Sequence, residues 1–183
     1  MENTFIAILR GINVSGAKPI KMEALRKTFQ NLGFTDVATY IQSGNVVFTA
    51  AETETLKLAI QISAAIKTDF GFEVPVIVLS ASELQTIIEN NPLNNGTNDT
   101  AFLHITFLAE NPGAFNLSEI ESRKQGDEAI VIDEKAVYLF CPHGYGKTKL
   151  TNTFLESKLK ITATTRNWKT ACELVRMAGE VTP

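Results

Sequence analysis

The sequence predicts an α+β protein made of two successive ferredoxin-like βαββαβ units with extra helices. Short β-rich runs and helical patterns alternate in the same order in each half of the 183-residue chain. In each half, two of the β-rich runs are separated by only a few residues, as in a hairpin. An Asn-, Gly- and Thr-rich segment at 91–100 separates the two series and has the composition of a linker. We therefore expect one subdomain at residues 1–92 and a second at residues 101–183.

The first half begins with a β-rich run that ends at Arg10-Gly11 and leads into a polar loop. Its two helical patterns carry apolar residues at helical spacing, and each is followed by a glycine in the C-cap position, Gly33 and Gly71. The turn Gln42-Ser43-Gly44 joins the two middle strands. The expected elements are a strand at 4–9, a helix after Pro19, strands at 36–41 and 45–49, a helix at 53–70 and a strand at 73–79.

An additional helix precedes the second half. It begins near Ala81 with the capping box Ser80-x-x-Glu83 and stops before Asn91-Pro92. A second capping box, Ser118-x-x-Glu121, predicts the start of a short helix. The other expected elements are strands at 101–109, 129–133, 136–141 and 160–164, and helices at 151–159 and 166–178. The two halves share no residue-level identity, so one mixed sheet with interleaved strands is the main alternative.

Composition indicates an ordinary globular protein, with 44% hydrophobic and 20% charged residues. The two cysteines, Cys141 and Cys172, cannot form a disulfide framework and lack zinc-ligand spacing, so we expect a reducing compartment, no metal and no cofactor. The apolar run at 5–9 is too short for a signal peptide or a membrane span. We therefore expect a cytoplasmic protein that does not associate with membranes.

The net charge of −3 is unevenly distributed along the chain. Residues 1–33 contain five basic and two acidic side chains, residues 34–122 contain two basic and eleven acidic ones, and residues 142–179 contain seven basic and two acidic ones. If the two basic ends meet in the fold, they form a positive face that attracts an anionic ligand. Otherwise they are ordinary solvated surface.

Two short motifs near the end of the second half resemble functional motifs but have the wrong spacing. Gly146-Lys147-Thr148 lies between a strand and a helix as in a P-loop, but Cys141 occupies the position where that motif needs glycine. A looser anion site made by Lys147, Lys149 and the next helix N-terminus remains open. Cys141 and His143, two residues apart on an extended chain, share a face without reliable hydrogen-bonding distance, which disfavours a Cys/His nucleophile.

Polar loop residues are better candidates for ligand binding. Arg10 and Asn13 follow the first strand, and Ser43 and Asn45 lie in the first hairpin turn. Together they offer hydrogen-bond donors without a base, which suits anion binding better than proton transfer. The alternative is structural: the glycines form turns, and the Asn and Ser side chains bond to nearby backbone. We expect His104 to be a structural residue, in the core or on one face of its strand, with its hydrogen-bonding groups paired. We expect Cys172 to lie in the core.

Several of these segments, in order along the chain, resemble the domain of unknown function 1697 family. The matching stretches run nearly from end to end of the chain. They are Arg10-Gly11-Ile12-Asn13-Val14-Ser15-Gly16, Lys21-Met22-Glu23-Ala24-Leu25, Leu32-Gly33-Phe34-Thr35-Asp36-Val37, Tyr40-Ile41-Gln42-Ser43-Gly44-Asn45-Val46-Val47-Phe48 and Thr164-Thr165-Arg166-Asn167-Trp168-Lys169-Thr170. The resemblance implies an α+β protein, commonly bacterial and cytoplasmic, with no established activity, cofactor or catalytic residue. The sequence departs from the family at Ser15, where the family's usual Gly-Gly pair would place glycine.

Three classes of function remain open from the sequence. The leading hypothesis is binding of a small anionic ligand or of nucleic acid. The donors for this are Arg10, Asn13, Ser43, Asn45, Lys147, Lys149, Arg166 and Asn167. The second class is an enzyme that acts on a phosphorylated or carboxylated metabolite. Lys147 or His143 would then take part in acid/base catalysis, although the sequence offers no convincing general base. The third is a structural or oligomeric protein, and the sequence leaves the oligomeric state undetermined.

Overall fold

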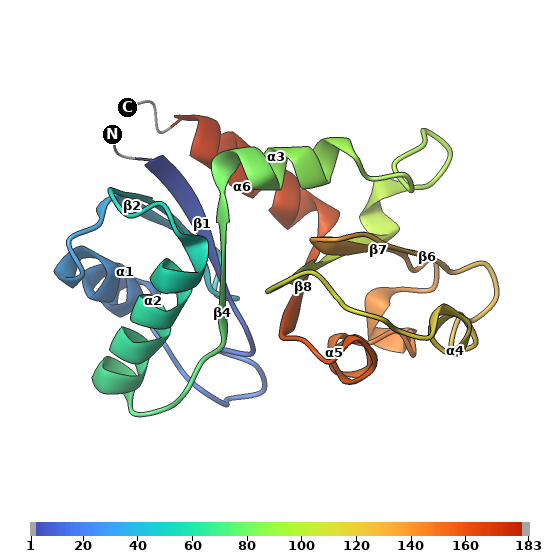
Figure 1. Ribbon diagram of the computed structural model, residues 1–183, viewed down its shortest axis with the longest axis horizontal. Coiled ribbons are helices and arrows are strands. Elements are labelled where there is room, and N and C mark those ends of the chain that lie inside the picture. Colours follow the sequence, from blue (N-terminus) through green and yellow to red (C-terminus); the bar gives the residue numbers. More distant parts are fainter. Residues whose placement is uncertain (1–2, 181–183) are drawn as a thin grey trace. The chain divides into compact units, whose positions relative to one another are not determined.

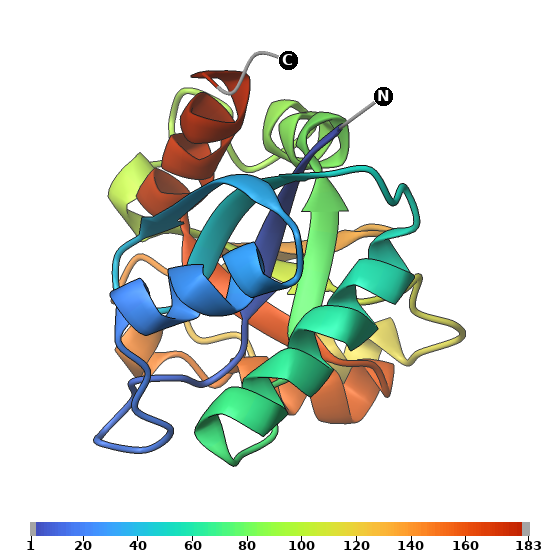
Figure 2. The ribbon, with the colours of Figure 1, turned by 90° about the vertical axis from the view of Figure 1, so that its left-hand side faces the viewer.

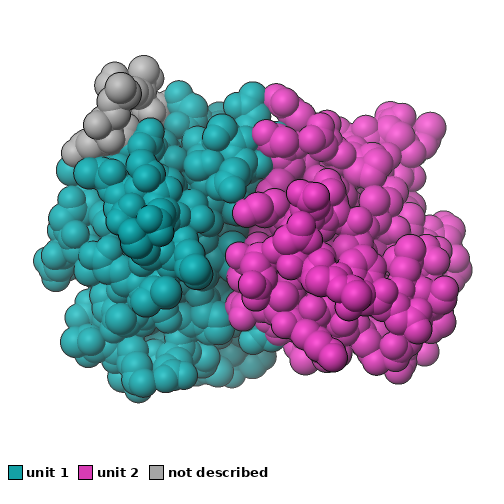
Figure 3. Space-filling model, in the orientation of Figure 1, with its two compact units in different colours: residues 1–85, 173–183 teal, residues 86–172 magenta. Residues whose placement is uncertain are grey.

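The computed structural model describes residues 3–180; Met1, Glu2 and residues 181–183, which fall within the expected subdomains, lie outside the described residues. The chain divides into two compact units, residues 1–85 with 173–183 and residues 86–172 (Figure 3). Each unit contains one four-stranded sheet. The separate sheets exclude the alternative of one mixed sheet with interleaved strands.

The first unit contains β1 (Asn3–Leu9), α1 (Met22–Asn31), β2 (Thr35–Tyr40), β3 (Asn45–Ala50), α2 (Thr55–Phe70) and β4 (Val76–Ser80) (Figure 1). Its strands lie in the order β2-β3-β1-β4 with every neighbouring pair antiparallel. This is the sheet of a ferredoxin-like βαββαβ unit. Figure 2 shows α1 and α2 side by side on one face of it.

The core of this unit lies between that face and the two helices. Phe5, Ala7 and Leu9 of β1 belong to it, and Phe48 of β3 packs against Phe29 of α1 with ring centroids 5.3 Å apart. The remaining β1 side chains, such as Ile6, alternate to the other face and are also buried. The apolar row of α2 faces the core as its spacing predicts, and Gly71 ends the helix in the left-handed conformation.

The second unit repeats this order. It contains β5 (Leu103–Leu108), α4 (Leu117–Glu121), β6 (Ala129–Ile132), β7 (Ala136–Phe140), α5 (Asn152–Leu159) and β8 (Ala163–Asn167). The strands lie in the order β6-β7-β5-β8, again with antiparallel neighbours. Two short 3-10 turns, η1 (Thr100–Phe102) and η2 (Tyr145–Lys147), precede β5 and α5. The prediction of two ferredoxin-like units with extra helices is therefore confirmed.

The extra helices occupy equivalent places in the two series. α3 (Ala81–Glu89) follows β4, and α6 (Trp168–Glu180) follows β8. The predicted capping box of α3 is present: Ser80 N donates to Glu83 Oε2 at 2.9 Å, and Glu83 N donates to Ser80 Oγ at 3.2 Å. Each series is thus a βαββαβ unit plus one helix.

Three local predictions were wrong. The strand expected at 160–164 is β8, Ala163–Asn167, because Lys160 takes a left-handed conformation with φ 57° as the C-cap of α5. The final helix consequently begins at Trp168, and Arg166 lies in a strand. The box at Ser118 does not cap α4, because Asn116 lies at the N-cap and its side chain accepts the Glu119 N–H.

Replacing Gly44 by alanine should lower the free energy of unfolding by about 2–4 kcal/mol. Gly44 has φ +85°, and an added Cβ would lie 2.7 Å from Leu9 Cβ and 2.8 Å from Ile12 Cδ1. Urea denaturation measures the loss. Gly16→Ala is the matched control, because Gly16 has φ +78° with no atom within 4 Å of an added Cβ, and it should lose only about 1 kcal/mol. Equal losses would show that crowding at Leu9 and Ile12 is not what requires glycine.

Candidate functional site

The loop after β1 and the first hairpin turn meet through Asn13. The Asn13 Nδ2 group donates to Ile20 O at 2.9 Å and to Gln42 O at 2.8 Å, and its Oδ1 accepts from Ile20 N at 2.8 Å. These bonds use both amide hydrogens. Asn13 has φ 55°, in the left-handed region that asparagine tolerates better than most residues. Its side chain therefore joins two loops.

Asn45 has a similar role inside the hairpin turn. It is fully buried, and its Nδ2 donates to Tyr40 O at 3.0 Å and to Ser43 Oγ at 2.9 Å. The turn is strained at Ile41, which has φ 47° and is 49% exposed. A β-branched residue rarely adopts this conformation, so the surrounding hydrogen bonds must hold it there. The predicted site residues Asn13, Ser43 and Asn45 thus form one hydrogen-bonded framework.

Arg10 lies at the end of β1, where its N–H donates to Pro75 O at 2.9 Å. Its side chain is partly exposed. Of the four predicted residues in these loops, Arg10 is the one that carries a charged group. The side-chain amides of Asn13 and Asn45 instead donate hydrogen bonds to backbone carbonyls. This favours the structural interpretation of these family-like loops.

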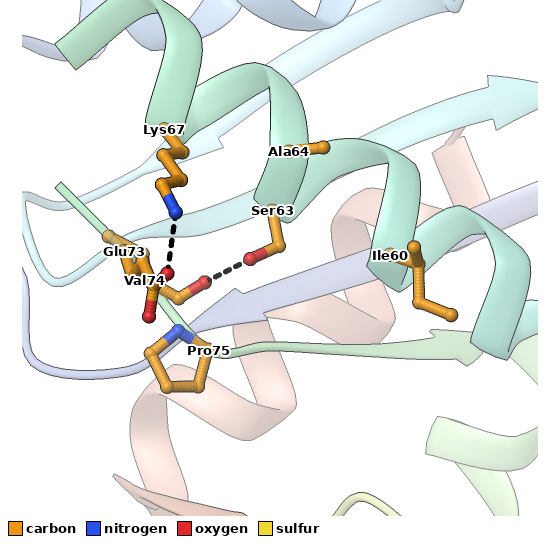
Figure 4. A pocket seen from close by; sticks show the side chains of 7 residues that line it. All are labelled: Ile60, Ser63, Ala64, Lys67, Glu73, Val74 and Pro75. Carbon is orange, nitrogen blue, oxygen red and sulfur yellow. Dashed lines mark hydrogen bonds and ion pairs between the residues drawn. The ribbon is translucent and has the colours of Figure 1, made fainter. Parts of the chain in front are cut away.

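A groove of about 380 Å³ lies between α2 and the segment that leads into β4 (Figure 4). Its polar side chains are already paired. Ser63 Oγ donates to Val74 O at 2.8 Å, and Lys67 Nζ lies 2.7 Å from Glu73 Oε1. The hydrogen bond from Lys67 keeps the pKa of the Glu73 carboxyl below its usual value. The groove otherwise exposes Ile60, and it offers no polar group to define a ligand.

The second unit presents unpaired cations. In the part of the chain between residues 3 and 180, five lysine ammonium groups form no hydrogen bond or ion pair with another described residue. They are Lys21, Lys147, Lys149, Lys160 and Lys169. Four of the five belong to the second unit. Two of them, Lys147 and Lys149, are among the predicted ligand-binding residues.

We call Tyr145–Thr151 the lysine loop. Its side chains alternate in exposure: Lys147 and Lys149 are exposed, whereas Thr148 and Leu150 are buried. The backbone at Thr148, which follows the 3-10 turn η2, has φ −68° and ψ 151°, the geometry of polyproline II. The two lysine side chains are both exposed to solvent, two residues apart in the chain.

Tyr145 connects the lysine loop to the sheet. Its ring stacks on His104, with centroids 4.7 Å apart and an interplanar angle of 20°. Its hydroxyl accepts the Asn152 N–H at 3.0 Å. Asn152 in turn receives a hydrogen bond from Thr165 Oγ1, which lies 2.7 Å from Thr106 Oγ1. This polar network fixes the ring pair between β5, β8 and the start of α5.

The sequence did not single out Tyr145, and it assigned His104 an ordinary structural place. Burial raises the pKa of the Tyr145 hydroxyl and lowers the pKa of the His104 imidazole. His104 is therefore neutral at neutral pH. The available signal was Tyr145 itself, an aromatic residue two positions before Lys147 in the loop already suspected of binding an anion.

Arg166 and Asn167 end on opposite faces of β8. Asn167 is paired with His104 across the ladder, and its Oδ1 accepts the Thr170 N–H at 2.8 Å at the start of α6. Arg166 is only 9% exposed and donates to Thr164 Oγ1 and Thr165 O, both at 3.0 Å. Burial lowers the pKa of its guanidinium to about 10. The structure thus brings Asn167, but not Arg166, to the sheet face on which His104 of β5 lies.

The Cys141–His143 segment does not form a nucleophile and base. Cys141 is fully buried, and burial, with a smaller effect from the Glu128 carboxylate, raises the pKa of its thiol to about 11. His143 is exposed, with its Nε2 3.0 Å from Asp127 Oδ1. A thiol with this pKa is protonated at neutral pH and is a poor nucleophile.

Among residues 3–180, no group of three or more His, Cys, Asp or Glu side chains is arranged to hold a metal ion. Within the same residues, no helix combines the length and apolar character that spanning a membrane requires.

The sequence model of a family described as "Protein of unknown function (DUF1697)" matches residues 2–138. The chain belongs to this family. The expected resemblance is therefore confirmed over residues 2–138. The lysine loop and β8 follow the matched segment.

A solved structure in the same fold is that of conserved bacterial protein SP0830 from Streptococcus pneumoniae. It has 25% sequence identity to this family member and a TM-score of 0.76, and the match covers 97% of this chain and 99% of the other. No curated protein matches the sequence. Membership in the family thus identifies the fold and leaves the function to be inferred from the site.

Asn13→Ala should destabilise the first unit by about 1–3 kcal/mol, because Ile20 N, Ile20 O and Gln42 O each lose a hydrogen-bond partner. Chemical denaturation measures the change. Asn13→Asp keeps an acceptor for Ile20 N and removes both donors, so it should lose most of the same stability. Wild-type stability in Asn13→Asp would show that the bonds to Ile20 O and Gln42 O contribute nothing.

In a Cys172→Ser variant, we expect no reaction with a thiol-reactive aromatic disulfide at pH 8 in the native state. Cys141 is then the one cysteine of the sequence, and at pH 8 it is buried and below its pKa of about 11. One thiol per chain should react after unfolding in urea. Rapid reaction of the native variant would restore the possibility of Cys141 chemistry.

Proposed function

We propose that the protein binds a small anionic ligand at the lysine loop. The observation that carries this proposal is the exposure of Lys147 and Lys149, two residues apart in an ordered loop, without a partner among residues 3–180. The Cα atoms of residues two apart in the chain are separated by at most about 7 Å. Two ammonium groups at this spacing repel each other, and an anion between them replaces the repulsion with two charge-assisted hydrogen bonds.

The loop is fixed before any ligand arrives. Lys147 N donates to Gly144 O at 3.0 Å, and Leu150 N donates to Thr148 Oγ1 at 3.1 Å. Leu150 is also part of the core cluster between α4, α5 and the sheet. Because the backbone is already ordered, binding need not supply the entropy cost of ordering it.

A small ligand fits these features better than nucleic acid does. Sheets that bind RNA stack bases on exposed aromatic side chains, but Phe5, Phe48, Phe107 and Tyr138 are buried in their sheets. The net charge of −3 also opposes binding to a long polyanion. We therefore assign the two lysines to one phosphate, sulfate or carboxylate group.

Lys147→Ala/Lys149→Ala should weaken binding of inorganic phosphate at least tenfold, because two charge-assisted hydrogen bonds are lost. Isothermal titration at low salt measures the wild-type Kd, which we expect in the millimolar range or below.

The matched control is Lys27→Ala/Lys57→Ala, which removes the same charge from ion-paired lysines of the first unit. It should bind phosphate as the wild type does. Equal weakening in both double variants would show that the change in net charge alone causes the effect. Absence of phosphate binding to the wild type would refute the proposal. A short RNA bound more tightly than phosphate, with affinity falling steeply with salt, would replace it with nucleic-acid binding.

A further inference from the structure

Building on this proposed function, we infer that the anion is the phosphate of a nucleotide whose base lies against the His104–Tyr145 ring pair. The observation behind this inference is the position of two stacked rings at the start of the lysine loop. Tyr145 lies two residues before Lys147, so an aromatic surface and the first ammonium group belong to the same short segment.

The ring pair is both ordered and partly exposed. The Tyr145 hydroxyl is held by Asn152 N, and its ring is held by the parallel stack with His104. Neither ring is fully buried. A rigid, partly exposed aromatic pair is a platform on which a heterocyclic base can stack, whereas an isolated phosphate or a sugar phosphate gains nothing from it.

Hydrogen-bonding groups lie beside the rings. His104 and Asn167 face each other across the β5–β8 ladder, two residues along from Thr106 and Thr165, whose hydroxyl oxygens are 2.7 Å apart. In an antiparallel ladder, hydrogen-bonded and non-hydrogen-bonded residue pairs alternate, so pairs two residues apart are of the same kind. The His104 and Asn167 side chains therefore belong to a closely spaced pair, as those of Thr106 and Thr165 do. The Asn167 side chain accordingly lies beside the His104 ring.

Asn167 has a hydrogen-bond donor available beside the rings. It uses its Oδ1 to accept from Thr170 N, and its amide hydrogens have no acceptor among residues 3–180. Every nucleobase carries acceptor atoms on its edge, so this amide can donate to a base that stacks on the ring pair. The ligand class is thus a nucleoside monophosphate.

The test compares adenosine 5′-monophosphate, ribose 5-phosphate and inorganic phosphate by isothermal titration. We expect the nucleotide to bind the wild type at least about tenfold more tightly than ribose 5-phosphate, because only the nucleotide stacks a base. His104→Ala should bring the nucleotide to the affinity of ribose 5-phosphate and leave ribose 5-phosphate unchanged. Lys147→Ala/Lys149→Ala should weaken both.

The wild type provides a measurement that does not depend on the folding of any variant. In nuclear magnetic resonance spectra, adenosine 5′-monophosphate should shift the ring-proton signals of Tyr145 and His104, and ribose 5-phosphate should not. Equal affinities for the two phosphates, or unshifted ring signals with bound nucleotide, would overturn this inference and leave anion binding standing. Binding of none of the three compounds would overturn both.

Discussion

The central strand of each sheet constrains everything around it. β1 and β5 each pair with a neighbour on both edges, so their backbone groups are used for sheet hydrogen bonds. The side chains of Phe5 to Leu9 in β1 are buried on both faces of the sheet. In β5, every residue is buried except His104, which is partly exposed. A strand in this position can present polar groups only near its ends. The candidate sites accordingly lie where strands become loops.

The fold was predictable because its signals are local. Alternating apolar residues mark the strands, glycines such as Gly71 mark helix ends, and the Ser80–Glu83 box marks the start of α3. The errors arose where a local signal was weak or misleading. β8 is rich in threonine and ends with Arg166 and Asn167, so neither hydrophobic alternation nor a turn residue marks it, and only pairing with β5 defines its bounds.

The site was predictable in its residue types but not in their roles. Asn13 and Asn45 were recognised as donors, but three of their acceptors are the backbone carbonyls of Ile20, Gln42 and Tyr40, and Gln42 is 29 residues away from Asn13 in the chain. Such a partner depends on the tertiary fold. The same is true of Lys147 and Lys149, because the sequence shows that they are charged and not that they lack an acid partner among residues 3–180. Tyr145 and His104 become neighbours only when β5 and η2 meet.

The division of the chain has a consequence for its biosynthesis. The first unit consists of residues 1–85 together with a late segment from Glu173 onward, which includes the C-terminal part of α6. A ribosome delivers this segment only after the whole second unit has been translated. The first unit therefore cannot complete its packing until translation has passed Glu173, although its sheet and both of its sheet-covering helices are synthesised in the first 85 residues. Its final assembly step thus depends on the last residues that the ribosome adds.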